Sequence, residues 1–222
     1  MTQIELTAED GHRLSTYLAE PSGGASPQGG LVVVQEIFGV NEHIREVTDG
    51  FARDGFLAIA PALFDRVERG VELDYDQEGF DRGRRLVGEL PQEGLMADLA
   101  AARDRVAGAG PVGMVGYCFG GAVVWVAAGG LSGIARVVSY YGSRIASFEE
   151  RAPKVPVMLH VGREDGSFPL EVVHRVQRRY PDLVTVHEYD AGHGFNCDRR
   201  ADYVKEAADL ARSRTLDFLR KS

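Results

Sequence analysis

A chain of 222 residues, with 44% hydrophobic and 26% charged residues, has the composition of a soluble globular protein and can bury a core without disulfides. Its formal net charge of -8 argues against nonspecific binding to nucleic acid or to anionic membranes. The length predicts a single domain over residues 1–222, because two average domains would need a longer chain.

The cysteine count and the N-terminus bear on the compartment. Two cysteines, Cys118 and Cys197, do not make a disulfide scaffold and suit a reducing environment. The first 13 residues are polar and acidic and lack the apolar core of a secretory signal. The weakly polar stretch 120–131 is too short and too rich in glycine to span a bilayer. We therefore expect a cytoplasmic protein, a monomer or small homo-oligomer, without membrane or nucleic-acid partners.

The predicted elements begin with a hairpin, because two alternating stretches flank the turn signal Asp10-Gly11. Residues 21–30 read as a loop. Buried strands then alternate with helices, with Asn41 as an expected N-cap and Pro169 as an expected first helical residue. Strands are predicted within 31–35, 55–63, 112–115, 134–142, 155–162 and 183–190, and helices over about 42–53, 78–87, 93–106, 120–129, 169–180 and 202–219. This alternation predicts one three-layer α/β domain, with a mostly parallel sheet covered by helices on both faces.

The stretch 116–120 fits the pattern glycine-x-nucleophile-x-glycine, with Cys118 in the nucleophile position. It lies between a predicted strand and a predicted helix, and a sharp turn there would expose the sulfur above a helix N-terminus that favours the thiolate. A lone cysteine is more often a small buried hydrophobe, but the spacing and its context favour a nucleophile.

A nucleophile needs a base, and His193 follows the last predicted strand between two glycines. Asp165 follows the preceding strand and could orient the imidazole, which gives the order nucleophile, acid, histidine. Glu164 and Asp190 compete for the acid role. His193 alone could be a solvated loop residue, and Asp165 could cap the helix near Pro169, although Ser167 is better placed for that.

Glu36 raises a separate question, because it ends a strand that reads as fully buried. An unpartnered buried carboxylate is costly, so Glu36 is either paired structurally or placed for chemistry.

The segments QEIFGVN, GYCFGG, YYG, GREDGSFP and AGHGF occur in an order that resembles the dienelactone hydrolases, a branch of the α/β-hydrolases, and the resemblance covers essentially the whole chain. It implies that Cys118, Asp165 and His193 form a catalytic triad. It also implies that Glu36 holds the resting thiol until substrate binding disturbs the contact. The backbone N–H groups of Ile37 and Phe119 would then form the oxyanion hole.

The substrate pocket departs from the family pattern. The resemblance implies two arginines that bind a substrate carboxylate, but Asp81 and Cys197 stand at the matching positions. Other arginines could substitute, namely Arg82, Arg84 or Arg85 for the first, Arg199 or Arg200 for the second, and Arg144. The aromatic residues that could line the pocket, or equally belong to the core, are Phe38, Tyr117, Phe119, Tyr140 and Tyr141.

The sequence therefore predicts a hydrolase of carboxylic esters or lactones that forms a thioester on Cys118, with a small molecule as its substrate partner. No cofactor and no metal are expected, because the six histidines are scattered and no nucleotide-binding glycine motif is present. Three alternatives remain: an esterase or thioesterase with the same triad and another acyl substrate, a redox- or electrophile-sensing thiol, and a noncatalytic scaffold.

Overall fold

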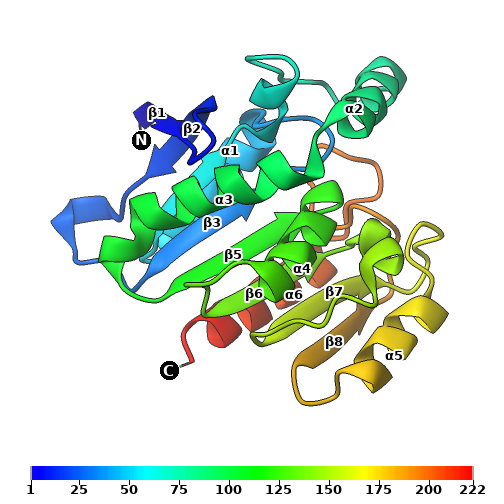
Figure 1. Ribbon diagram of the computed structural model, residues 1–222. Helices are drawn as coiled ribbons and strands as arrows, with labels where there is room; N and C mark the ends of the chain where they lie inside the picture. The colour runs from blue at the N-terminus through cyan, green and yellow to red at the C-terminus, as the bar shows by residue number, and fades with distance from the viewer. Residues whose placement is uncertain (1, 222) are drawn as a thin grey trace. The chain divides into compact units, whose positions relative to one another are not determined.

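The computed structural model describes residues 2–221 (Figure 1). The chain divides into two compact units, one up to Gly113 and one from Met114, with the boundary inside a strand. The expectation of one domain over 1–222 stays a prediction. Among the described residues, no helix is long and apolar enough to cross a membrane.

The first unit contains a four-stranded arrangement in the order β1-β2-β4-β3. The hairpin prediction is confirmed, since β1 and β2 pair antiparallel and the Gly11 N–H donates to the Ala8 carbonyl in their turn. β4 pairs antiparallel with β2 and parallel with β3. Helix α3 lies in front of these strands and α1 behind them (Figure 1), so both faces are covered. The bounds are β1 Thr2–Thr7, β2 Arg13–Ala19, β3 Gly30–Val34, β4 Leu57–Pro61, α1 Glu42–Arg53, α2 Gln77–Glu89 and α3 Gln92–Val106.

The second unit has the strand order β5-β6-β7-β8, and β6, β7 and β8 pair in parallel. Helix α4 packs on β6 in front of the strands, and α6 lies behind β6 and β7 (Figure 1). The strands are almost fully buried up to β7, as expected for parallel strands covered on both faces. The bounds are β5 Val112–Tyr117, β6 Arg136–Tyr140, β7 Val157–Gly162, β8 Val184–Tyr189, α4 Phe119–Gly130, α5 Leu170–Arg179 and α6 Lys205–Leu219.

The helix termini test the finer predictions. Asn41 caps α1 as predicted, and its side chain accepts the Ile44 N–H at 3.2 Å. Pro169 is the N-cap of α5, one residue before the predicted role. The last helix begins at Lys205 and not at 202, because the Val204 N–H donates to the Phe195 carbonyl and holds that residue extended.

Short 3-10 turns complete the backbone. They lie at Ser22–Gly24, Leu63–Arg66, Ala107–Ala109 and Ser143–Phe148. The turn Ser143–Phe148 follows β6 and was not predicted, since its six residues carry no long apolar periodicity.

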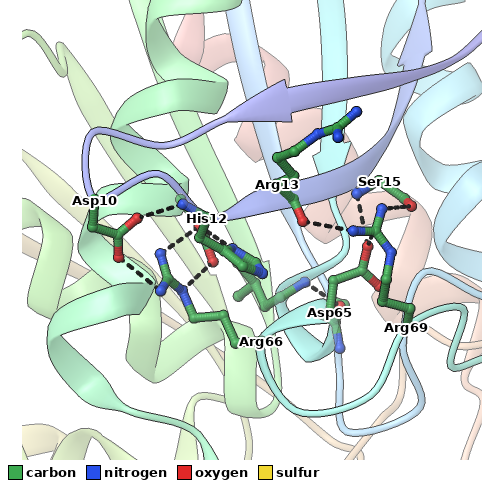
Figure 2. A network of polar contacts seen from close by, with 10 residues as sticks. Asp10, His12, Arg13, Ser15, Asp65, Arg66 and Arg69 are labelled. Carbon is green, nitrogen blue, oxygen red and sulfur yellow. Dashed lines mark hydrogen bonds and ion pairs between the residues drawn. The ribbon is translucent and has the colours of Figure 1, made fainter.

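A polar network fastens the N-terminal hairpin to the rest of the first unit (Figure 2). Arg66 makes two hydrogen bonds, of 2.7 and 2.8 Å, to the fully buried carboxylate of Asp98 on α3. It also pairs with Asp10 in the hairpin turn at 2.8 Å. His12 contacts the same Asp98 carboxylate at 3.1 Å. The bidentate contact fixes the Arg66 guanidinium on α3, and the contacts of Asp10 with Arg66 and of His12 with Asp98 attach the hairpin turn to this pair.

Helix α2 approaches the segment after β3 very closely. Gly83 is buried on α2, and a Cβ atom there would overlap the carbonyl oxygen of Ile37. The absence of a side chain therefore sets the distance between α2 and the residues that follow Val34. On the same helix, Gly88 is exposed and has open space where a Cβ would lie.

These two glycines give a matched test. Gly83→Ala should lower the free energy of unfolding by roughly 1–3 kcal/mol, because backbone must move to admit the methyl group. Gly88→Ala should raise it by roughly 0.5 kcal/mol through helix propensity. Urea unfolding of both variants measures the difference. Equal effects would show that α2 does not pack on Ile37 in this way.

Candidate active site

Cys118 occupies a sharp turn between a strand and a helix. β5 ends at Tyr117 and α4 begins at Phe119, so Cys118 is the one residue between them. Its φ of 52° and ψ of -113° are rare for a residue with a side chain and cost on the order of 1–3 kcal/mol. The Cys118 N–H donates to the Tyr140 carbonyl at 3.0 Å, and its own carbonyl accepts the Gly121 N–H at 3.0 Å. These two bonds hold the turn in its strained form.

The turn is possible because the residues packed closely on each side of it are glycines, which have no side chain to clash. A Cβ at Gly116 would overlap the carbonyl oxygen of Gly120, and a Cβ at Gly121 would lie 2.5 Å from Ser139 Oγ. Backbone contact therefore requires glycine at 116, and the close approach of Ser139 and Gly142 requires it at 121. The turn leaves Cys118 partly exposed as the N-cap residue of α4.

Cys118, His193 and Asp165 form a continuous chain of polar contacts. His193 Nε2 lies 3.1 Å from Cys118 Sγ, and the other ring nitrogen, Nδ1, lies 2.8 Å from Asp165 Oδ2. All three residues belong to the second unit and follow β5, β7 and β8. Because β6, β7 and β8 run parallel, their carboxyl ends bring distant loops to one edge.

Asp165 is the acid that contacts the histidine, and its carboxylate is completely buried. Its second oxygen accepts the N–H groups of Ser167 at 2.8 Å and Phe168 at 3.2 Å, which fixes the carboxylate before α5. Ser167 therefore donates to Asp165 and does not cap α5. The competing Asp190 is exposed and pairs with Arg163 at 2.5 Å, and Glu164 is exposed.

The electrostatic environment favours the imidazolium form of His193. Burial lowers the pKa of His193, but hydrogen bonding and charge interaction with Asp165 and Cys118 outweigh it and raise the pKa to about 10. Part of this rise comes from Cys118 and would be lost if the sulfur lost its charge.

The loop that carries His193 is tightly folded. Gly194 has a φ of 85°, and a Cβ there would lie 2.8 Å from Arg200 Cζ. Arg200 therefore has its guanidinium beside the His193 loop, whereas Arg199 is exposed. Cys197 is fully buried in the loop, four residues after the histidine.

Tyr141 lies behind the imidazole. Its ring centroid is 5.2 Å from that of His193 in an edge arrangement, and its backbone has a φ of 40°. Tyr117 is 1% exposed and packs against Tyr140 and Tyr141, which favours a core role over contact with a substrate. Arg144 is exposed on the turn after β6.

Phe119 begins α4 in the second unit, and the remaining predicted site residues belong to the first unit. Glu36 is fully buried just after β3, and Ile37 and Phe38 are buried beside it. The Phe38 ring packs against Tyr75 at 4.4 Å. Arg84 is exposed on α2 and lies over the Phe80 ring. The position that matches a family arginine, Asp81, accepts a hydrogen bond from Gln77.

Comparison with known proteins bears on this geometry. The model of the dienelactone hydrolase family matches residues 14–222. A carboxymethylenebutenolidase of Pseudomonas putida is 34% identical over 227 residues, which cover 97% of this chain and 94% of that protein. A carboxymethylenebutenolidase of Pseudomonas knackmussii gives the same values.

Solved structures extend the likeness to the fold. A crystal structure from Klebsiella pneumoniae, assigned provisionally to the dienelactone hydrolases, has a TM-score of 0.83 at 28% identity and covers 100% of both chains. An esterase of Pyrococcus furiosus has a TM-score of 0.66 at 17% identity over 98% of this chain and 90% of that one, which supports the fold alone. The predicted fold class, a three-layer α/β-hydrolase with a mostly parallel sheet, is confirmed.

The contact between sulfur and imidazole predicts a linked titration. In Cys118→Ala the pKa of His193 should fall below the wild-type value of about 10, because the contributions of Cys118 are removed. NMR titration of the His193 ring measures both values. An unchanged pKa would show that the sulfur does not interact with the imidazole in solution.

The same shift predicts a pH-dependent stability. The pKa of His193 is raised above its ordinary value of 6.5, so its stabilising contribution is complete below that pH and is lost as the pH rises through about 10. The difference in unfolding free energy between wild type and His193→Gln should shrink across this window. Urea unfolding at a series of pH values measures it, and a difference that grows with pH would contradict the assignment.

Proposed function

This chain belongs to the dienelactone hydrolase family and is a hydrolase of esters or lactones, and we propose that it works through a thioester on Cys118. The observation that carries the proposal is the contact chain from Sγ through the His193 ring to Asp165, with lengths of 3.1 and 2.8 Å. A nucleophile, a base and an orienting acid within hydrogen-bond reach are the parts that acyl transfer needs.

In the acylation step the thiolate of Cys118 attacks the carbonyl carbon and forms a carbon–sulfur bond. The carbonyl electron pair moves onto oxygen, and when it returns, the bond to the alcohol or enolate oxygen breaks. His193, protonated because its pKa is about 10, gives its Nε2 proton to that leaving oxygen. Asp165 keeps the ring in position throughout, because its carboxylate is itself held by two backbone N–H groups.

Two backbone N–H groups are proposed to hold the oxyanion. Phe119 is the first residue of α4, so its N–H belongs to the helix N-terminus and is available to a ligand. Ile37 is the second proposed donor, and α2 packs against its carbonyl. Each such donor contributes about 3 kcal/mol to lowering a barrier of this type.

In the deacylation step the role of His193 reverses. Once the sulfur is acylated it carries no charge, so the contribution of Cys118 to the raised pKa of His193 disappears. The neutral Nε2 then takes a proton from water as the oxygen attacks the thioester carbon. Collapse of this intermediate breaks the carbon–sulfur bond, and it releases the acid and the thiolate.

Glu36 is proposed to act on the resting thiol. Its complete burial just after β3 makes a charge there costly, which supports a specific role for the carboxylate. For the substrate, Asp81 and the buried Cys197 at the family's arginine positions argue against the carboxylate grip of those enzymes. We propose a small ester or lactone as the substrate, with Arg200 beside the His193 loop as an alternative anion contact.

The covalent step has a direct test. Cys118→Ala should lower turnover of an ester and lactone panel by at least about 1,000-fold, because no nucleophile remains. Rapid quench and intact mass spectrometry of the wild type should detect an acyl adduct on Cys118. Cys197→Ala is the matched control and should keep turnover, since that thiol is buried. Equal turnover by Cys118→Ala would disprove the mechanism, and rapid alkylation without any turnover would favour a sensing thiol.

The role of Glu36 is tested separately. Glu36→Gln keeps the shape but removes the charge, so the rate of Cys118 alkylation by iodoacetamide and its pH profile should change. Glu72→Gln is a control on an exposed carboxylate of the same unit, which pairs with Arg45. If Glu36→Gln matches the wild type in both rate and profile, Glu36 does not act on the thiol.

A further inference from the structure

A buried set of polar side chains lies behind the ends of β6, β7 and β8, on the side covered by α6. His160 Nδ1 lies 2.7 Å from the Tyr189 hydroxyl, and His160 Nε2 lies 2.9 Å from Thr215 Oγ1. The Tyr140 hydroxyl lies 2.7 Å from the same Thr215 oxygen. Arg214 donates to the Tyr189 hydroxyl at 3.2 Å. We call Tyr140, Thr215, His160 and Tyr189 the internal relay.

Burial lowers the pKa of His160 well below its ordinary value, with added contributions from His187 and Arg214, so the ring is neutral and carries one N–H. Arg214 can only donate, so the Tyr189 oxygen accepts from it and can give its own proton to His160 Nδ1. In the tautomer that matches this arrangement, His160 carries its proton on Nε2 and donates to Thr215 Oγ1.

Backbone carbonyls of two internal relay residues bind the turn of the nucleophile and the residue that packs on His193. The Tyr140 carbonyl accepts the Cys118 N–H at 3.0 Å, which is the bond that holds the strained turn. The His160 carbonyl accepts the Tyr141 N–H at 2.8 Å, and the Tyr141 ring packs on His193. The side chains of Tyr140 and His160 therefore fix two residues whose backbone carbonyls accept the N–H groups of Cys118 and Tyr141.

The other two loops of the triad are attached through Tyr189. Its carbonyl accepts the Arg163 N–H at 2.8 Å and the Ala191 N–H at 2.9 Å. Arg163 lies two residues before Asp165, and Ala191 lies two residues before His193. The Tyr189 ring also packs on Phe195 at 5.0 Å. One tyrosine thus anchors the acid loop and the histidine loop to the same point.

We propose that the internal relay is a positioning device, which sets the separations of Cys118, Asp165 and His193. It joins β6, whose Tyr140 carbonyl holds the Cys118 turn, to β7 and β8, which precede the loops of Asp165 and His193. This inference rests on the proposed function of those residues. Apolar side chains would fill the same space with comparable stability, whereas hydrogen bonds fix distance and angle together. Acyl transfer is sensitive to such geometry, since a misplacement of about 1 Å can cost roughly 100-fold in rate.

The test removes one shared hydroxyl. Thr215→Val keeps the shape of the side chain but breaks the contacts to both His160 and Tyr140. It should lower kcat on an aryl ester by roughly 10- to 100-fold, with little change in KM because the internal relay touches no substrate. The rate of Cys118 alkylation by iodoacetamide, and the NMR titration of His193, should both shift. Thr215→Ser retains the hydroxyl and should restore all three.

Two further variants keep the test decisive. Thr48→Val removes a fully buried helical hydroxyl in the first unit, which bonds the Ile44 carbonyl, and serves as the matched control. Tyr140→Phe removes only one hydroxyl of the internal relay and replaces Thr215→Val if that variant does not fold. Nitrogen NMR shifts of His160 report directly whether Nε2 carries the proton.

The outcomes separate positioning from stability alone. If Thr215→Val and Tyr140→Phe lower the unfolding temperature but keep wild-type kcat, alkylation rate and His193 titration, the internal relay only stabilises and the proposal is wrong. The proposal is also wrong if Thr215→Ser does not restore kcat, the alkylation rate and the His193 titration. It is equally wrong if Thr48→Val lowers kcat as much as Thr215→Val does. If the wild type hydrolyses no ester, the proposed function fails, yet alkylation and NMR still decide the positioning role.

Discussion

The candidate site depends on one strained residue, because the backbone at Cys118 bends through a region that side chains rarely adopt. Crowded glycines on each side make the bend possible, and the bond from its N–H to the Tyr140 carbonyl holds it in place. Since that carbonyl belongs to a neighbouring strand, the position of the sulfur is a property of the packed strands and not of the motif alone. A motif of five residues therefore needs the second unit around it to become a site.

Burial and charge act together in the site. Asp165 can be completely buried because two backbone N–H groups and the imidazole share its charge. The same carboxylate, together with the sulfur, reverses the effect of burial on the pKa of His193. A histidine whose pKa depends on the state of its sulfur partner can serve as an acid before the thioester forms and as a base afterwards.

In each unit a buried set of polar side chains joins strands or the hairpin to a helix. In the first unit, Asp10 and His12 attach the hairpin to the pair formed by Arg66 and Asp98 of α3. In the second, the internal relay joins β6, β7, β8 and α6 behind the triad. The sequence contained a signal for the latter in the polar His160 within the apolar strand 155–162, but its partners are 29 and 55 residues away, and no local pattern connects them.

The sequence by itself determined the alternation of strands and helices, the hairpin at Asp10-Gly11, the Asn41 cap and the turn at Cys118, because these follow from periodicity and from the conformations of a few adjacent residues. Only the tertiary structure decided that Asp165, and not Glu164 or Asp190, meets His193, and that Val204 delays the last helix. Three acids that follow the ends of β7 and β8 are chemically alike in a sequence. Burial and hydrogen bonding distinguish them, and both arise only when loops from separate strands pack against one another.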